Sequence, residues 1–548
     1  RGAARLHARR LPGPLRAGHQ GHAHRGRDEV ITPFANPHPS IVKPLQARGF
    51  TAFRADSDKC ANGPYTDCDE CENHLLIDCD ECKNTAFIEL DKCKIQDITK
   101  SDECETKGWN MLKRKAYQRI AFWKEHKTNQ ALLITGARQV GKTYLVEEFG
   151  QNEYEHMAEF NLLLDDSVRR SFAQATSPDD LMLRISVAAQ GPLVVGKTLI
   201  FIDEIQACPQ IVTFIKGLVD RGDYDYILSG SLLGVELEDV RSLPVGYLDE
   251  FIMYPLDFEE FCWALGLSET VFDIVRDSYG AVKPVPDFVH QRLTDLFHRY
   301  LLVGGMPAAV TSFVESKVID PVRAIQTNIR AYYEHDIKQY APKDKRLVIQ
   351  EMYRLIPSEL QSQNRRFQVS SIAEVKRFSQ IEDEFLWLTR ANVALPVFNV
   401  AAPVAPLRAS KERRLLKLFY SDVGLLTSSY GKKSALGILD GQAAMNMGGV
   451  YENVVAQELT AHGFTNLYYF TKKGIGELDF LIETDDGDVL ALEIKSGRYY
   501  RSHAALDNAL SADGYTIDKA MVFAETNVFQ EEGVTYLPMY MLTMLVNE

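Results

Sequence analysis

The fold of this chain is decided by the stretch Ala131-Leu-Leu-Ile-Thr135 and the segment that follows it, Gly136-Ala-Arg-Gln-Val-Gly-Lys-Thr143. The first part is a short apolar run of the kind that forms a buried strand. The second part is a complete Gly-x4-Gly-Lys-Thr pattern, whose glycines let the backbone wrap closely around a phosphate chain with its N–H groups pointing inward. Residues 143–149 then predict a helix that Gly150 ends and whose N-terminus faces the phosphates. The sequence therefore predicts an α/β domain that binds a nucleotide.

Each residue of this loop has an expected part in binding ATP. Lys142 would reach the β- and γ-phosphates and act in catalysis, and the Thr143 hydroxyl would ligate Mg²⁺. The backbone contacts to the phosphates would come from Gly136, Ala137, Arg138, Gln139, Val140 and Gly141. ATP and Mg²⁺ are therefore the expected cofactors.

Two further strands are expected to end beside the loop. One is an apolar run that stops at Asp203 and Glu204, where Asp203 would bind Mg²⁺ and Glu204 would polarise the attacking water. Carboxylates that only cap the next helix are the alternative for this pair. The other strand ends at Ser229 and Ser231, which could sense the γ-phosphate because ligands of parallel sheets bind beyond the carboxyl ends of strands. A plain turn explains these serines equally well.

Beyond the loop, several motifs make residues 111–310 resemble the AAA+ ATPases. They are similar to the prokaryotic group in which an AAA-type domain precedes a C-terminal domain of unknown function. The motifs are Phe201-Ile-Asp-Glu-Ile-Gln206, Leu228-Ser-Gly-Ser-Leu-Leu233, Tyr254-Pro-Leu-Asp-Phe-Glu-Glu-Phe261 and Gly304-Gly-Met-Pro307. The resemblance implies ATP hydrolysis and a place for Pro307 near the nucleotide base. Arg241 is a candidate for the arginine that stabilises transition-state charge in such ATPases, and an ordinary surface residue is the alternative.

Residues 266–400 are expected to begin as a helical lid and to end in a winged-helix-like connector. Apolar residues from Leu293 to Leu301 recur at helical spacing, and later helices precede a strand-like run over 394–400. A winged helix can bind DNA, or serve only as a spacer. A basic cluster follows, formed by Arg408, Lys411, Arg413, Arg414 and Lys417. It could contact phosphates, and a solvated helix face explains it equally well.

A second group of charged residues lies on two alternating runs near the C-terminus. Alternation predicts two strands joined as a hairpin, with Asp479 across from Glu493 and Glu477 across from Lys495. Two carboxylates beside a lysine are typical of a metal-dependent phosphodiesterase.

In that arrangement Asp479 and Glu493 would hold Mg²⁺, Lys495 would orient or deprotonate water, and Glu452 could complete the site. The spacing resembles the PD-(D/E)xK restriction-endonuclease-like fold over roughly residues 330–530. Cross-strand salt bridges on a surface hairpin are the alternative, and a fold alone does not establish cutting.

Most of the cysteines lie in the first part of the chain. Among them, Cys68, Cys71, Cys79 and Cys82 form two Cys-x2-Cys pairs that could bind zinc. The spacer between the pairs is shorter than in zinc ribbons, so a non-native or weakly structured extension over residues 1–110 is the favoured interpretation.

Composition limits the function classes. The chain has 548 residues, of which 45% are hydrophobic, so it can bury the cores of several domains. Its formal net charge of -14 argues against a general electrostatic binder of nucleic acid or membranes. No apolar run approaches the roughly 20 residues that a membrane-spanning helix needs. A cytoplasmic protein without a membrane partner is expected.

The sequence thus predicts four parts and one main function. They are the extension 1–110, an ATPase domain over 111–265, the lid and connector over 266–400, and an α/β nuclease-like domain over 401–548. The expected function is Mg²⁺-dependent ATP hydrolysis coupled to a nuclease-like domain directed at nucleic acid, with DNA as a candidate partner. The alternative is an ATP-dependent switch or scaffold that binds a protein and has an inactive C-terminal domain. Assembly into a homo-oligomer stays open.

Overall fold

The computed structural model describes residues 74–77, 86–89, 112–231, 246–362, 365–372, 375, 377–439, 446–497 and 499–547. The zinc alternative at the four N-terminal cysteines and the candidate Arg241 lie outside these residues. The chain divides into two compact units, Arg1–Lys107 and Gly108–Glu548. In the first unit, the described part is an antiparallel pair of β1 (His74–Ile77) and β2 (Ala86–Glu89).

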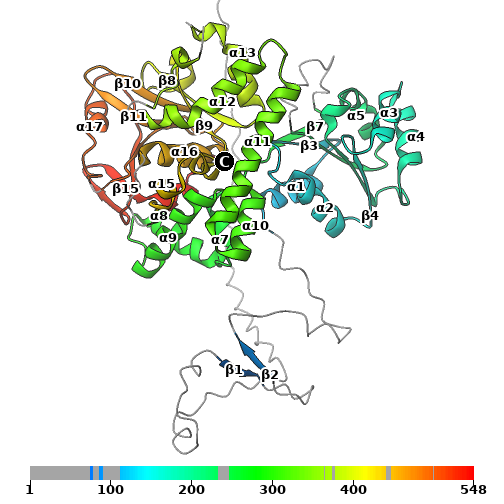
Figure 1. Cartoon of the computed structure of the whole chain (residues 1–548), viewed down its shortest axis with the longest axis horizontal. Helices are drawn as coiled ribbons and strands as arrows, with labels where there is room; N and C mark the ends of the chain where they lie inside the picture. Colours follow the sequence, from blue (N-terminus) through cyan, green and yellow to red (C-terminus); the bar gives the residue numbers. More distant parts are fainter. Residues whose placement is uncertain are drawn as a thin grey trace, which may run out of the picture. The chain divides into compact units, whose positions relative to one another are not determined.

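The second unit begins with a parallel sheet of five strands in the order β4-β5-β6-β3-β7 (Figure 1). The strands are β3 (Ala131–Thr135), β4 (His156–Asn161), β5 (Thr198–Asp203), β6 (Asp225–Ser229) and β7 (Leu248–Ile252). This confirms the predicted α/β fold and the three predicted strands, which end at Thr135, Asp203 and Ser229. All residues of β3 and β5 are buried, as expected for central strands of a parallel sheet.

Helices cover both faces of this sheet. Side chains alternate along each strand, so Leu132 and Ile134 pack on one face with α1 and α2, while Leu133 packs on the other face with α3, α4 and α5. The helices are α1 (Lys115–His126), α2 (Lys142–Glu153), α3 (Asp166–Ala173), α4 (Pro178–Ala188) and α5 (Gln210–Arg221), with the short helix η3 (Ile205–Ala207) after β5. The sheet therefore presents its carboxyl edge, and not its faces, to a ligand.

A helical region follows the sheet, as the periodicity around Leu293 predicts. Its members are α7 (Phe258–Ala264), α8 (Glu269–Ala281), α9 (Asp287–Val303), α10 (Pro307–Ser316), α11 (Ile319–Tyr340), α12 (Arg346–Gln361), η5 (Val369–Ser371), η6 (Phe378–Gln380) and α13 (Glu382–Arg390). Among the described residues, no helix is long and apolar enough to cross a membrane.

The C-terminal part is a mixed sheet of eight strands in the order β14-β15-β13-β12-β11-β10-β8-β9. The strands are β8 (Ala394–Val400), β9 (Lys411–Tyr420), β10 (Leu467–Lys472), β11 (Gly476–Glu483), β12 (Val489–Ile494), β13 (Lys519–Ala524), β14 (Phe529–Glu531) and β15 (Val534–Pro538). The helices of this part are η7 (Leu407–Ser410), α14 (Val423–Ser428), α15 (Lys432–Leu436), α16 (Met447–Ala461), α17 (Ala504–Leu510) and η8 (Met539–Met544).

The hairpin of β8 and β9 corrects the prediction of a separate winged helix. The hairpin is present, but β8 also pairs in parallel with β10, for example Val397 with Leu467. The hairpin is therefore an edge of the C-terminal sheet, and the predicted boundary at residue 400 runs through that sheet. The residues of the basic cluster from Lys411 to Lys417 lie on strand β9, so the helix face considered for them is also wrong.

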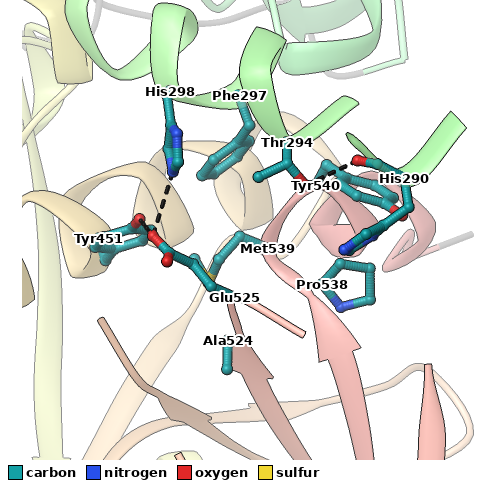
Figure 2. Close-up of a pocket in the computed structure, with 10 residues that line it drawn as sticks. All are labelled: His290, Thr294, Phe297, His298, Tyr451, Ala524, Glu525, Pro538, Met539 and Tyr540. Atoms are coloured by element: carbon teal, nitrogen blue, oxygen red, sulfur yellow. Dashed lines mark hydrogen bonds and ion pairs between the residues drawn. The ribbon is translucent and has the colours of Figure 1, made fainter. Parts of the chain in front are cut away.

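The helical region packs directly on the C-terminal part. A cavity of about 110 Å³ lies between α9 and the ends of β13 and β15 (Figure 2). Its polar side chains pair with one another: Glu525 lies 3.3 Å from His298 and accepts a 3.0 Å hydrogen bond from Tyr451, while His290 and the Tyr540 hydroxyl are 2.9 Å apart. We assign this cavity no ligand.

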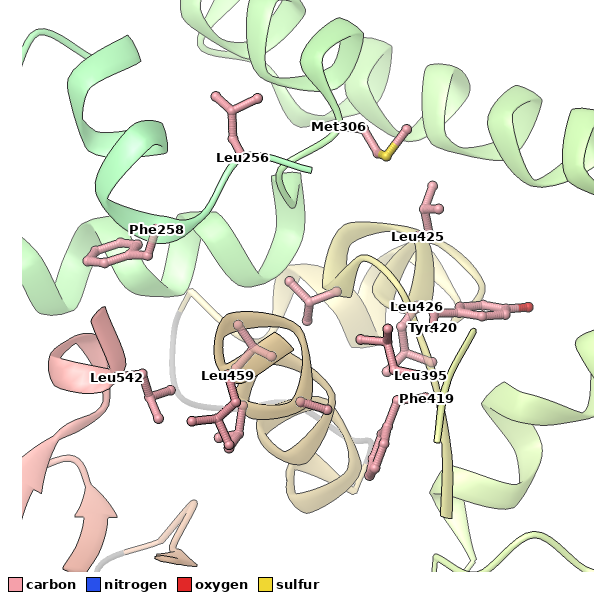
Figure 3. Close-up of a cluster of buried hydrophobic side chains, with 14 of the residues drawn as sticks. Leu256, Phe258, Met306, Leu395, Phe419, Tyr420, Leu425, Leu426, Leu459 and Leu542 are labelled. Carbon is pink, nitrogen blue, oxygen red and sulfur yellow. The ribbon is translucent and has the colours of Figure 1, made fainter. Parts of the chain in front are cut away.

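One apolar core extends from the five-stranded sheet to the C-terminal part. Figure 3 shows Leu256 and Met306 in the same buried cluster as Leu425 and Leu459. These side chains are at most 1% exposed. Because the core is continuous, the described residues after 111 pack as one body whose parts share their stability.

Candidate nucleotide site and C-terminal carboxylate cluster

The loop between β3 and α2 has the backbone that its glycines permit. Gly136, Gln139 and Gly141 have positive φ values of 136°, 67° and 95°. A Cβ atom on Gly136 would lie 2.2 Å from the carbonyl oxygen of Met253, so only glycine fits there. No side chain caps the first turn of α2, which leaves its N–H groups available to an anion.

Lys142 lies inside this loop. Its ammonium group donates hydrogen bonds to the carbonyl oxygens of Gly136 at 3.0 Å and Ala137 at 2.9 Å, and the residue is 6% exposed. Burial lowers the pKa of Lys142 to about 8, although the Glu204 and Asp203 carboxylates act in the opposite direction. No carboxylate of a described residue is in direct contact with this buried cation, so a phosphate group would be a favourable partner.

Asp203 and Thr143 meet at the carboxyl edge of the sheet. The Thr143 hydroxyl donates a 2.8 Å hydrogen bond to one oxygen of Asp203, which also accepts a 3.0 Å bond from the amide of Asn161. The other oxygen accepts bonds from the backbone N–H of Glu204 at 2.9 Å and from the Ser229 hydroxyl. Ser229 thus binds Asp203, and its predicted role at the γ-phosphate stays a prediction.

Glu204 has a left-handed backbone with φ of 56° and ψ of 47°, which is unusual for a residue with a side chain. Its Oε2 atom accepts hydrogen bonds from the Ser231 hydroxyl at 3.2 Å and from the amide of Gln206. Sequence reasoning noted Gln206 only as part of a motif and missed Asn161. No local pattern marks Asn161, because its place beside Asp203 depends on the pairing of β4 with β5.

The Arg138 side chain contacts α11. Its guanidinium group pairs with Asp336, donates a 3.2 Å hydrogen bond to the Tyr340 hydroxyl and lies 5.2 Å from the centre of that ring. It also donates a 3.3 Å hydrogen bond to Ser231. Burial raises the pKa of Asp336 to about 6, although Arg138 acts in the opposite direction. The loop is therefore connected to the helical region through the side chain of Arg138.

A cavity of about 260 Å³ opens beside the loop on its other side. It is lined by Leu112, Arg114, Gly141, Tyr144, Leu145, Pro307, Ala308 and Thr311. Arg114 fixes this wall, because it donates hydrogen bonds to the carbonyl oxygens of Val140 at 2.9 Å and Tyr254 at 2.7 Å. A largely apolar pocket next to a phosphate loop suits a nucleotide base.

The motif around Pro307 is hydrogen-bonded through Gly305 to two distant segments, at Leu256 and at Asp422. The Gly305 N–H donates a 2.6 Å hydrogen bond to Asp422, and the Gly305 carbonyl accepts a 2.7 Å bond from the Leu256 N–H. A Cβ atom on Gly305 would lie 1.9 Å from the carbonyl oxygen of Leu256. Burial raises the pKa of Asp422 to about 6, although the backbone N–H groups of Gly305, Leu425 and Gly424 act in the opposite direction. The pocket wall is thus attached to the C-terminal part.

The C-terminal hairpin has the predicted register. Phe480 pairs with Leu492 and Leu481 with Ala491, and this places Asp479 opposite Glu493. Asp479 accepts a 2.9 Å hydrogen bond from the Ile494 N–H, and Lys495 lies 2.8 Å from Glu493.

The two carboxylate oxygens of Glu493 differ in their contacts. Its second oxygen is buried without a hydrogen bond to any described residue. Burial, together with the nearby Asp479 charge, raises the pKa of Glu493 to about 8.

Glu477 has other partners than the expected Lys495. It lies 2.9 Å from Lys417 and 2.7 Å from Arg366. Lys417 is fully buried and also lies 2.9 Å from Glu452 on α16, which pairs with Arg365 as well. Lys417 is therefore no DNA contact on the surface, which corrects that part of the basic cluster. Burial raises the pKa of Glu452 to about 7, although Lys417 acts in the opposite direction.

The donor atoms at the two sites differ in how well they suit Mg²⁺. The Thr143 hydroxyl and the Asp203 carboxylate are oxygen donors of the type that Mg²⁺ prefers, and they are in contact. Among the residues that the structure describes, no group of three or more His, Cys, Asp or Glu side chains is arranged to hold a metal ion. The residues of the loop fit Mg²⁺, whereas a metal at Asp479 and Glu493 stays a prediction.

Comparisons with known protein families match three segments of the chain. Residues 128–262 match the model of a family described as AAA domain. Residues 294–435 and 447–542 match two families that are each described as a domain of unknown function, DUF8612 and DUF4143. No curated protein matched the chain.

Similar solved structures are distant in sequence. A Walker-type ATPase of Pyrococcus abyssi is 12% identical, with a TM-score of 0.35, over 58% of this chain and 95% of that chain. The Aeropyrum pernix ORC1 protein in complex with DNA is 12% identical, with a TM-score of 0.26, over 60% of this chain and 92% of that chain. TM-scores this low carry no argument about function. The family match and the geometry of the loop thus agree that residues 128–262 are similar to an AAA domain.

Proposed function

We propose that this chain binds ATP and hydrolyses it to ADP and phosphate at the carboxyl edge of the five-stranded sheet. The observation that carries the proposal is the contact between Thr143 and Asp203 beside the loop that contains Lys142. Lys142 and Thr143 lie in the first turn of α2 and Asp203 ends β5, and the chemistry of these groups matches that of phosphoryl transfer.

Each group has a defined part in the reaction. Lys142 exchanges its bonds to the loop carbonyls for bonds to phosphate oxygens, and the loop N–H groups stabilise the same charge. Glu204 accepts a proton from the attacking water. When bound at Thr143 and Asp203, Mg²⁺ supplies further stabilisation of charge on the phosphate oxygens. The base would lie in the pocket of Arg114 and Pro307.

The proposal is tested by phosphate release from ATP. The wild-type chain, purified and supplied with ATP and Mg²⁺, is expected to release phosphate steadily, and excess chelator is expected to stop the release because the phosphate charge is then uncompensated. Absence of phosphate release above background at all tested ATP concentrations would contradict the proposed hydrolysis. It would favour the alternative of a switch that binds ATP without turnover.

A second candidate function, metal-dependent cleavage of DNA, is favoured by one observation in the C-terminal part. Oε2 of Glu493 has no hydrogen bond to a described residue, Lys495 pairs with Oε1 of the same carboxylate, and Asp479 lies opposite Glu493 in the register expected for a phosphodiesterase. That oxygen could act as a ligand of a divalent cation, and the bound cation would favour the ionised form of Glu493. We propose DNA as the substrate of this site, with a scaffold that binds a protein as the alternative.

Cleavage of duplex and single-stranded DNA with Mg²⁺ or Mn²⁺, with and without ATP, tests this second function. Asp479→Asn keeps an acceptor for the Ile494 N–H but loses a negative charge, so it is expected to abolish cleavage while folding and ATP binding persist. Asp486→Asn, in the exposed turn of the same hairpin, is the matched control. If the wild-type chain cuts no substrate under these conditions, the carboxylates are a structural cluster or a binding surface.

A further inference from the structure

Gln206 is a buried amide that touches the proposed general base. It lies on η3, directly after β5, and is 5% exposed. Its side-chain N–H group donates to Oε2 of Glu204 and lies 3.4 Å from the Ser231 hydroxyl. Its carbonyl oxygen is buried without a hydrogen bond to any described residue. Leaving a buried acceptor unpaired costs free energy, so packing alone is a poor reason for an amide here.

The contacts of Glu204 are one-sided. Both Gln206 and Ser231 donate to the same oxygen, Oε2, and no described residue donates to Oε1. Ser231 is itself fixed, because Arg138 donates a 3.3 Å hydrogen bond to its hydroxyl. One carboxylate oxygen is therefore restrained and the other is left available.

We infer that Gln206 is a positioning residue for ATP hydrolysis, which binds Oε2 of Glu204 so that Oε1 accepts the proton of the attacking water. This inference rests on the proposed ATPase function. In the step, the water oxygen bonds to the γ-phosphorus, and the bond from that phosphorus to the oxygen bridging the β- and γ-phosphates breaks. The bridging oxygen keeps the electron pair and leaves as ADP, and the water proton passes to Oε1 of Glu204.

A carboxylate that loses this restraint can rotate about its last side-chain bonds, which reduces the time that Oε1 faces the water. Binding of ATP does not need this orientation, because the loop and Lys142 provide it. The expected signature is therefore a lower kcat at an unchanged KM.

Gln206→Met tests the inference, since methionine has a similar shape and cannot donate. Its kcat for ATP hydrolysis is expected to fall about 10- to 100-fold, with KM for ATP within about twofold of the wild-type value. Gln326→Met is the matched control. Gln326 is also buried and donates to the carbonyl oxygens of Leu302 and Val303. Its own carbonyl oxygen likewise has no hydrogen bond to a described residue, but its side chain has no hydrogen bond to Glu204. Its kcat is expected to stay within about twofold of wild type.

A double-mutant cycle separates positioning from a purely structural role. If Gln206 acts through Glu204, adding Gln206→Met to a Glu204→Gln chain is expected to change kcat little, because the base is already absent. The inference would be overturned if Gln206→Met lowered kcat by the same factor in the wild-type and the Glu204→Gln chains. It would also be overturned if the kcat of Gln206→Met equalled that of wild type. Gln206→Asn, whose shorter amide cannot reach Glu204, gives the same readout should the methionine variant fail to fold. If the wild-type chain itself releases no phosphate, the proposed ATPase function fails, and the role of Gln206 fails with it. If only the Gln206 variants behave differently from expectation, the role of Gln206 alone fails.

Discussion

Glu204→Gln is expected to lower kcat for ATP hydrolysis by about 10²- to 10⁴-fold, the usual contribution of a general base. Glutamine has the same shape and can still contact Ser231 and Gln206, so the loop and the sheet edge should keep their structure. It cannot accept a proton from water. Because ATP is bound by the loop, Lys142 and Thr143, the variant should retain ATP affinity and remain in the ATP-bound state.

Phosphate release and the binding of a fluorescent ATP analogue measure the two effects separately. Glu155→Gln is the matched control, since Glu155 is an exposed glutamate of the same domain that pairs with Lys197. Its kcat is expected to equal that of wild type. If Glu204→Gln also retained the wild-type kcat, Glu204 would not be the base, and Asp203 and Glu204 would be reduced to capping and metal contacts.

Lys417→Met is expected to lower the free energy of unfolding by about 3–5 kcal/mol, the cost of breaking a buried ion pair from one side. Lys417 and Glu452 are both fully buried, 2.9 Å apart, and Glu477 lies at the same distance from the lysine. Methionine would leave Glu452 with Arg365 as its remaining cation. That partner places the expected loss near 3 kcal/mol, the lower end of the range.

Urea unfolding followed by tryptophan fluorescence measures this loss. Lys432→Met, which breaks an exposed pair with Asp320, is the control and is expected to unfold at the wild-type urea concentration. Adding Glu452→Gln to Lys417→Met should recover part of the stability, because no buried carboxylate then lacks its partner. A Lys417→Met chain as stable as wild type would mean that the cluster is hydrated and not the buried pair described above.

The parts of the site that sequence patterns predicted well are those fixed by local chain geometry. The strand before Gly136 and the start of the helix after Gly141 follow from spacing alone, because the loop has one compatible backbone. The predicted helix end at Gly150 was wrong, because α2 continues through this glycine to Glu153. The register that places Asp479 opposite Glu493 follows from alternation and one short turn.

The parts that were missed depend on contacts between distant segments. β8 and β9 look like a wing because they are adjacent in sequence. The further partner of β8 in the sheet is β10, which comes only after α16. The pairing of Lys417 with Glu452 and Glu477 depends on that same topology, so the prediction that Lys417 belongs to a basic run on the surface was wrong. The contact of the Arg138 side chain with Asp336 was not predicted for the same reason, since Asp336 lies on a helix far along the chain. No spacing rule could connect these residues.

The binding of ATP to the purified chain in the presence of Mg²⁺, measured by titration calorimetry, tests the central claim most directly. The wild-type chain should bind one ATP, and Lys142→Ala should lose most of that affinity, because the cation inside the loop is removed. No heat of binding from the wild-type chain, or equal affinity in both chains, would contradict the assignment of Gly136–Thr143 as a working nucleotide site.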